Sequence, residues 1–187
     1  SSAACPWQGL AQLGGRIMWG TYATAPVMVH ELGHNLGFAH STEPALVGLY
    51  EYGDSTSFMG RSDALTLDVA HRYQGGWLDQ AAVGTFEEDG TYELASLDLP
   101  FSGVQQALVF PDATTPSRLW FVSARTPVGR AGRALWEEDR SGPSLHSLGP
   151  TFGELSLLQG TVDDIGEVLK APNEGLRIVH RDVSLDR

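Results

Sequence analysis

One stretch of the chain, His30 to His40, reads HELGHNLGFAH. Its first two histidines, His30 and His34, are four residues apart, so a helix would place them one turn apart on one face. From there both rings can point a nitrogen at a single ion. Zinc binds such imidazoles at about 2.0–2.1 Å, and a catalytic zinc site keeps one position for water. The spacing therefore predicts a helix that carries two ligands of a zinc site.

The residues on either side limit the length of this helix. Thr24 is a candidate cap, Pro26 suits the first turn, and Gly37 suits the left-handed residue that ends a helix. If the helix continued, His40 would lie about 9 Å further along the axis than His34, at roughly 1.5 Å per residue. One metal ion could not bind both. We therefore expect the chain to leave the helix at Gly37 and fold back, which brings His40 to the metal as the third ligand.

Glu31 is the candidate general base. It follows His30 directly, which turns it about 100° around the helix, away from the ligands and toward a water on the metal. A carboxylate there can take a proton from the attacking water and deliver it to a leaving amine. Three histidines without a fourth ligand favour a catalytic site over a closed structural one. The alternative is three histidines whose hydrogen bonds are satisfied on a buried helix and that bind no metal.

The composition narrows the class of protein. The net charge is −11 with a single lysine, Lys170, which argues against a nucleic-acid or anionic-membrane partner. No apolar run approaches the roughly 18 residues that a membrane span needs. Cys5 is the only cysteine, so it either pairs outside this chain or is a plain buried thiol. The start, without Met or a signal-peptide pattern, reads as a fragment or a processed chain, and the acidic balance suits a secreted protein.

The remaining segments predict an α+β fold. A second helix is expected from Asp63 to Gln74, with Ser62 or Asp63 as its cap, and short turns separate the later strands. We expect two domains, 1–82 with the histidines and 83–187 as an antiparallel β-sandwich. The segments expected to be loops are 5–14 and 41–62, and those expected to be strands are 16–19, 91–97, 106–110, 118–123 and 175–183.

At every fixed position the run from His30 to His40 resembles the metzincin signature HExxHxxGxxH. Residues 52–60, YGDSTSFMG, resemble the tight turn that lies beneath the zinc in that clan, with Met59 as its methionine; the alternative is a Met that fills a generic core. Met59 lies 19 residues after His40, further than in matrixins. Three parts look more like the gametolysin (autolysin) peptidases of green algae: the Tyr-Gly-Asp…Met-Gly form of this turn, Cys5-Pro6-Trp7…Gly9-Leu10-Ala11, and Ala70-His71-Arg72-Tyr73…Gly76-Trp77-Leu78.

This resemblance implies a secreted zinc endopeptidase that hydrolyses peptide bonds of extracellular or cell-wall (glyco)proteins. The zinc ligands would be His30, His34 and His40, with Glu31 as the base. Residues 1–82 would be the C-terminal part of a metzincin-like domain that lacks most of its N-terminal subdomain, since 29 residues precede the first ligand. The tyrosine that astacins and serralysins place two residues past the Met is absent. A non-catalytic interaction or adhesion module that retains a structural zinc site is the alternative function.

Four further residues have ordinary roles in this interpretation. Asp54 is expected to hold its loop through backbone amides rather than to bind calcium. His71 is expected to be a packing or surface histidine, because zinc already has three ligands and needs an open position. His146 and His180 have no ligand spacing and are expected at the surface.

Overall fold

The computed structural model describes residues 5–21, 24–45, 48–61, 64, 66–126, 142–150, 153–162, 164–170 and 175–181. Over these residues the fold is α+β, mostly sheet with few helices, as expected. The helices are α1 (Ala25–Asn35), α2 (Val69–Gln74) and the single 3-10 turn η1 (Gln80–Ala82). The strands are β1 (Gly9–Ala11), β2 (Met18–Gly20), β3 (Ser41–Pro44), β4 (Leu49–Tyr50), β5 (Val83–Thr85), β6 (Ala107–Pro111), β7 (Leu119–Arg125), β8 (Gly142–Leu148), β9 (Ser156–Thr161), β10 (Val168–Lys170) and β11 (Arg177–Val179).

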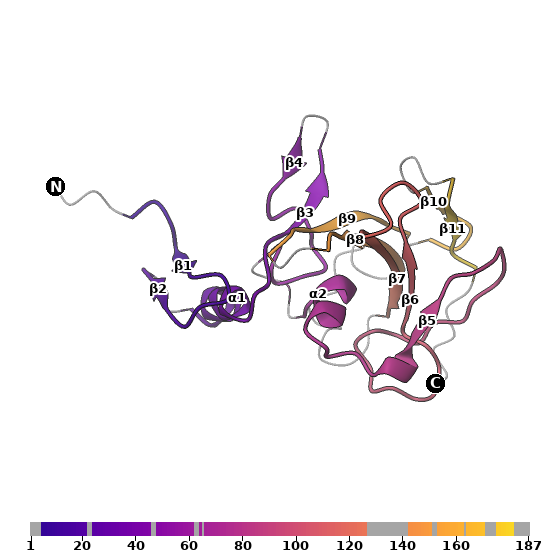
Figure 1. The fold of residues 1–187 in the computed structure, drawn as a ribbon, viewed down its shortest axis with the longest axis horizontal. Helices are drawn as coiled ribbons and strands as arrows, with labels where there is room; N and C mark the ends of the chain where they lie inside the picture. Colours follow the sequence, from indigo (N-terminus) through magenta and orange to yellow (C-terminus); the bar gives the residue numbers. More distant parts are fainter. Residues whose placement is uncertain are drawn as a thin grey trace.

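A seven-stranded mixed sheet is the centre of the molecule (Figure 1). Its order is β4-β3-β9-β8-β7-β6-β5, with β3 parallel to β9, β5 parallel to β6, and the other neighbours antiparallel. Strands β3 and β4 come from before residue 83, and the other five come from residue 83 onward. The division of the chain at 82/83 stays a prediction, as do the metzincin-like domain and the β-sandwich.

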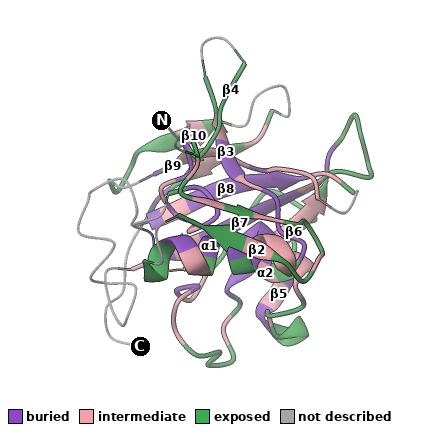
Figure 2. Ribbon diagram, turned by 90° about the vertical axis from the view of Figure 1, so that its left-hand side faces the viewer, coloured by how far each residue is buried: buried purple, intermediate pink, exposed green. Residues whose placement is uncertain are grey.

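The two faces of this sheet bury different partners. Strand β7 alternates, so that Phe121 faces Val69 and Ala70 of the short helix α2, whereas Trp120 and Val122 face the opposite way. On that second face the partly buried side chains of the β10–β11 hairpin pack against them. Figure 2 shows the buried residues concentrated in the central strands. Burial of one large side chain such as Phe121 contributes roughly 1.5–3 kcal/mol.

The N-terminal hairpin and α1 lie together to one side of the sheet (Figure 1). Strands β1 and β2 pair antiparallel, in the register Leu10↔Trp19. The side chain of Asn35 ties the hairpin to the helix end, because its amide donates to the carbonyls of Gln12 and Ile17 at 3.0 and 3.1 Å. The prediction of a loop over residues 5–14 is wrong where β1 forms. The strand predicted at residues 16–19 is observed at Met18–Gly20. A three-residue strand is too short to show an alternating pattern.

The second helix is much shorter than expected. It begins at Val69, with Asp68 as the cap whose side chain accepts from the backbone N–H of His71. The carbonyl of Leu67 is bound by Arg125 at 2.6 Å and by Arg72 at 3.0 Å, so it is turned toward these guanidinium groups instead of a helical amide. The expected caps Ser62 and Asp63 lie outside the described residues.

The strand predictions were right in the middle of the chain and wrong at several other places. Strands β6 and β7 confirm the strands expected at 106–110 and 118–123, and β11 lies within 175–183, of which 182 and 183 are outside the described part. Residues 91–97 form no strand; Ser96 makes an isolated bridge to Ala124 of β7, and the N–H of Leu97 donates to the carbonyl of Ala124 at 2.8 Å. The expected loop 41–62 contains β3 and β4.

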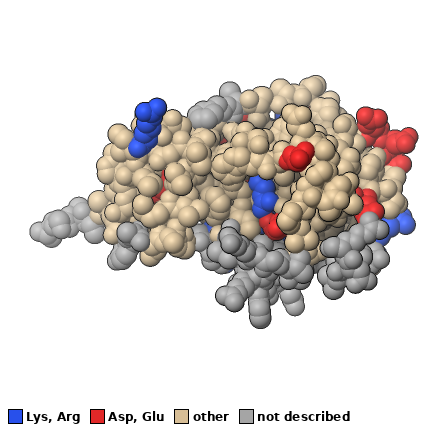
Figure 3. Space-filling model, turned by 90° about the horizontal axis from the view of Figure 1, so that it is seen from below, with Lys and Arg blue, Asp and Glu red and all other residues tan. Residues whose placement is uncertain are grey.

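The structure also bears on three expectations drawn from the composition: the state of Cys5, the lack of a basic patch, and the lack of a membrane span. Cys5 is exposed, so it is not a buried thiol. On the face seen in Figure 3, the basic side chains of the described residues stand apart from one another and form no patch. In the part of the chain that the structure describes, no helix has the length and apolar character needed to cross a membrane.

Candidate metal centre

The end of α1 folds the chain back onto its own last turn. Gly37 has a φ of +98°, its N–H donates to the carbonyl of His34 at 2.9 Å, and the N–H of Phe38 donates to the carbonyl of Gly33 at 3.0 Å. This pair of bonds is the Schellman pattern, which needs a left-handed residue after the helix. The fold-back expected at Gly37 is thus observed, and it returns the chain so that His40 lies beside the helix.

The three histidines then converge. One ligand nitrogen from each of His30, His34 and His40 lies within 4.8 Å of the others. The Nε2 atoms of His34 and His40 are 3.1 Å apart. Two nitrogens bound at 2.0–2.1 Å to a tetrahedral zinc ion lie about 3.3–3.4 Å from each other, so this spacing is close to that of a zinc site.

Each imidazole uses its other nitrogen to bind a neighbouring acceptor. Nδ1 of His30 donates to the carbonyl of Phe58 at 2.8 Å, Nδ1 of His34 to the carbonyl of Phe38 at 2.7 Å, and Nδ1 of His40 to a carboxylate oxygen of Glu51 at 2.7 Å. Because these acceptors can only accept, they fix the proton on Nδ1 and leave the Nε2 lone pairs facing one another. Converging lone pairs repel unless a cation lies between them. The donor set therefore fits a zinc ion.

Burial keeps two of these imidazoles in the neutral form that binds metal. It lowers the pKa of His30 to about 4, with a smaller lowering from the other two histidines and a partial offset from its bond to Phe58. The pKa of His40 is lowered chiefly by burial as well, although Glu51 opposes the shift. A neutral imidazole presents a free lone pair, so at neutral pH no proton has to leave these rings before a metal binds.

Glu31 lies on the next face of α1, with only 6% of its surface exposed. Its Oε2 has no hydrogen-bond partner among the described residues, and burial raises the pKa of its carboxyl group, partly offset by His34. Gly9 of β1 passes so close that a Cβ there would overlap the Glu31 carboxylate. The carboxylate is thus confined under β1 with one oxygen uncommitted. Gly9 gave no sequence signal of this role.

An open cleft of about 630 Å³ leads to the site. The turn Tyr50–Gly53 forms one wall, and it brings to the site Glu51, which the sequence interpretation had not mentioned, and Tyr52, to which that interpretation gave only a place in the turn beneath the metal. Glu51 binds His40, and the ring of Tyr52 lies 4.1 Å from the ring of His40, centroid to centroid. The cleft is lined by Pro6, Trp7, Gln8, Gly9, Val27, His30, Glu31, Tyr50, Tyr52, Gly60 and Arg61.

Met59 is fully buried beneath α1. A Cβ on Gly33 would overlap its sulfur, so the absence of a side chain at Gly33 lets the thioether lie against the helix there. The carbonyl of Met59 accepts the N–H of Ser41 at 3.0 Å, and Ser41 directly follows the third histidine. Met59 therefore packs next to both segments that carry the histidines, in a buried cluster with Phe38 and Leu67, and its role as the methionine of the expected turn stays a prediction.

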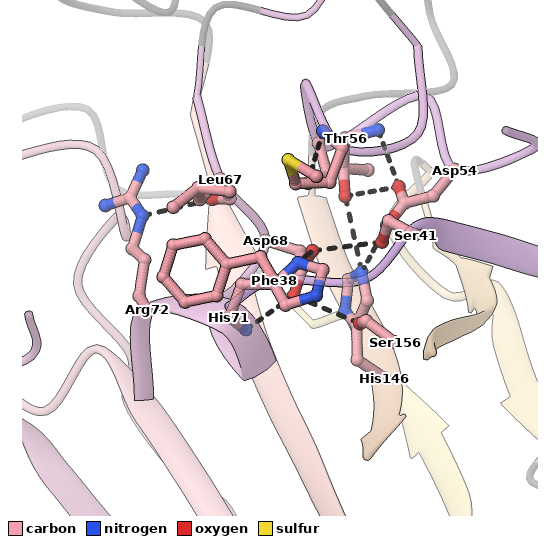
Figure 4. A network of polar contacts seen from close by, with 12 residues as sticks. Phe38, Ser41, Asp54, Thr56, Leu67, Asp68, His71, Arg72, His146 and Ser156 are labelled. Carbon is pink, nitrogen blue, oxygen red and sulfur yellow. Dashed lines mark hydrogen bonds and ion pairs between the residues drawn. The ribbon is translucent and has the colours of Figure 1, made fainter. Parts of the chain in front are cut away.

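A buried polar network holds this loop from below (Figure 4). Asp54 accepts four bonds: from the N–H and hydroxyl of Thr56 at 2.7 Å each, from Ser41 at 2.6 Å, and from His146 at 3.1 Å. Ser41 also lies 3.0 Å from Asp68, the cap of α2. Asp54 is thus the loop-stabilising residue expected, and the sheet residue His146, expected at the surface, is fully buried.

The second carboxylate of the network is satisfied in the same way. Asp68 accepts from the hydroxyl of Ser156 at 3.1 Å, and Nδ1 of His71 lies 2.7 Å from its other oxygen. Burial alone would raise the pKa of both Asp54 and Asp68, but the adjacent histidines outweigh it and lower both pKa values. His71 is therefore a packing residue and not a fourth ligand. His180, expected at the surface, is buried too.

Comparison with known proteins places this site in a family. A family model described as gametolysin peptidase M11 matches residues 1–120, which is more than half of the chain and includes all three histidines and Glu31. No curated protein and no solved structure gives a significant match. Peptidases of this family act on proteins, and the family implies a metal. The chain belongs to the gametolysin peptidase M11 family.

Proposed function

We propose that this protein is a zinc-dependent endopeptidase that hydrolyses peptide bonds of extracellular or cell-wall (glyco)proteins. One observation carries the proposal: three imidazoles with their Nδ1 protons committed bring one ligand nitrogen each within 4.8 Å of the others, and the neighbouring Glu31 keeps an uncommitted oxygen. His30, His34 and His40 would hold the ion. The open cleft above them has room for an extended peptide.

The residues of the site divide the reaction between them. A bound zinc ion would supply a Lewis acid that lowers the pKa of a water molecule and polarises the peptide carbonyl. Glu31 takes a proton from the attacking water, because burial gives its carboxylate a raised pKa and greater basicity. After the C–N bond breaks, the same proton passes from Glu31 to the leaving amine nitrogen. The bonds from Nδ1 of each histidine keep the rings aligned throughout.

The proposal extends to location and architecture. A secreted, extracellular location is supported by the strongly acidic composition with one lysine and by the resemblance to secreted algal peptidases. The metzincin-like assignment of residues 1–82 is supported by the fold-back at Gly37 and by Met59 beneath the helix. A β-sandwich over 83–187 is supported by the packing of the β10–β11 hairpin on one face of the large sheet.

Zinc content and cleavage of an unfolded protein test this function in the native chain and in Glu31→Gln. We expect both proteins to bind one zinc ion and only the native protein to cleave, because the amide cannot accept the water proton. Cleavage should stop when a chelator removes the metal and return when zinc is added. If both proteins bind zinc and neither cleaves, the site belongs to a non-catalytic module.

A further inference from the structure

Tyr52 occupies an unusual position at the rim of the metal centre. It has a φ of +62°, and no other non-glycine residue in the described part of the chain has a positive φ. It is the third residue of the turn Tyr50–Gly53, which is closed by the N–H of Gly53 donating to the carbonyl of Tyr50 at 3.0 Å. Gly or Asn normally takes this position, because a larger side chain costs on the order of 1 kcal/mol there. The cost at Tyr52 points to a use for its side chain.

The surroundings of Tyr52 indicate what that use is. Its ring lies 4.1 Å from the ring of His40 and 5.8 Å from that of His30, and the residue lines the cleft beside Glu31. The residue is 45% exposed, and its hydroxyl makes no hydrogen bond to any described residue. A phenol carries its proton at neutral pH. Tyr52 therefore brings an uncommitted hydrogen-bond donor to the open side of the histidines.

Building on the proposed peptidase function, we infer that Tyr52 is a further catalytic residue, whose hydroxyl donates a hydrogen bond to the peptide oxygen as that oxygen becomes negatively charged. The attacking water forms a C–O bond while the carbonyl π electrons move onto this oxygen, and Glu31 holds the proton from water. Tyr52 keeps its own proton. When the carbonyl re-forms, the C–N bond breaks and the amine takes the proton from Glu31. Donors that meet developing charge in this way stabilise a transition state more than a ground state.

The loop that carries Tyr52 is fixed well enough for such a role. Residue 54, two positions later, is the fully buried Asp54 with its four hydrogen bonds, and Glu51, one position earlier, binds His40. A Cβ at Gly53 would lie 2.8 Å from the carbonyl oxygen of Tyr50, which shows how tight the turn is. The residues before and after Tyr52 are thus both held in place, so its hydroxyl is pre-positioned beside the histidines before a substrate binds.

A purely structural role for the ring against His40 predicts different behaviour from a donor role. Tyr52→Phe keeps the ring contact and removes only the hydroxyl, so a structural role would leave it active. Tyr73→Phe is the matched control, because Tyr73 on α2 is 40% exposed, packs against Phe121, and does not line the cleft. Tyr52→Gly suits the positive φ and serves as a second variant without the hydroxyl.

Three measurements test the inference: kcat and KM for a peptide, the affinity for a phosphinic peptide that mimics the tetrahedral carbon, and the affinity for zinc by chelator competition. For Tyr52→Phe we expect kcat to fall about 10²–10³-fold with little change in KM, since this is the usual effect of removing one such donor. The phosphinic peptide should bind more weakly, zinc affinity should be unchanged, and Tyr52→Gly should lose at least as much kcat. Tyr73→Phe should match the native protein in every measurement.

Different failures of this experiment have different meanings. An unchanged kcat and phosphinic-peptide affinity in Tyr52→Phe overturns the donor role alone. A fall in kcat that follows a fall in zinc affinity also overturns it, because Tyr52 would then act only through His40. A native protein that binds zinc and cleaves nothing overturns the proposed peptidase function, and the role of Tyr52 with it.

Discussion

Replacement of Gly37 by Ala tests whether the turn after α1 controls the metal site. Gly37 has a φ of +98°, and a side chain in the left-handed region costs about 1–2 kcal/mol. The zinc-bound protein must hold this turn, because it brings His40 to the two helical histidines. The metal-free protein can relax it by releasing the bond from Phe38 to Gly33. If the strain is relieved only without metal, zinc affinity falls about 5–30-fold, since 1.4 kcal/mol is tenfold in an equilibrium constant.

The control for this variant is Gly76→Ala. Gly76 occupies the same position after α2, with a φ of +67° and open space where a Cβ would be, so the backbone penalty is similar, but Gly76 does not line the cleft and its turn brings no histidine to the metal site. We expect it to lower the melting temperature without changing zinc affinity. Chelator competition at fixed pH measures the affinity, and thermal unfolding with and without zinc measures the stability. Unchanged zinc affinity in Gly37→Ala, or an equal loss in Gly76→Ala, would refute the reasoning.

Three other variants test the surroundings of the site. Glu51→Gln should weaken zinc binding by about 10-fold. This is the low end for a residue that orients a ligand, because Glu51 is largely exposed. Chelator competition measures the affinity, and an unchanged value would refute the prediction. Gly9→Ala should lower kcat and leave zinc bound, since its Cβ would displace the Glu31 carboxylate; steady-state kinetics with metal analysis would show it, and normal kcat would contradict it. Because the pKa values of Asp54 and Asp68 are lowered in the folded protein, their carboxylates stabilise the fold at pH values above the usual aspartate pKa near 4, and this stability is lost as the pH falls through and below that value. Urea unfolding from pH 7 to 3 measures the free energy of unfolding, which should fall less with pH in Asp54→Asn than in the native protein.

The local part of the site was predictable because its determinants are close together in sequence. Two histidines at helical spacing, a base next to the first, and a glycine three residues past the second define their own geometry. The helix, the left-handed turn and the approach of His40 all follow from backbone rules that act over a few residues. The roles assigned to His30, His34, His40 and Glu31 stay predictions until metal and activity are measured.

The residues that were missed owe their positions to long-range contacts. Strand β8 reads GPSLHSL, and its buried polar residues do not give the alternation of apolar and polar residues that predicts a strand. His146, for example, is buried against a carboxylate instead of apolar side chains. Gly9 reaches Glu31 only through the pairing of β1 with β2. Glu51 and Tyr52 face the histidines because the turn between β4 and the buried Asp54 directs them there. The spacing of residues in the sequence does not indicate that these side chains approach the histidines or Glu31.

The buried network has a consequence for how this site can be moved or shortened. The match to the family ends at residue 120, yet His146 and Ser156, which bind the two buried carboxylates beneath the histidine motif, come after it. A fragment cut at residue 120 would lack β8 and β9, so Asp54 and Asp68 would lose both these partners and the strands that bury them. The histidine motif therefore depends on distant parts of the chain, and a graft or truncation that keeps the motif must also keep β8 and β9.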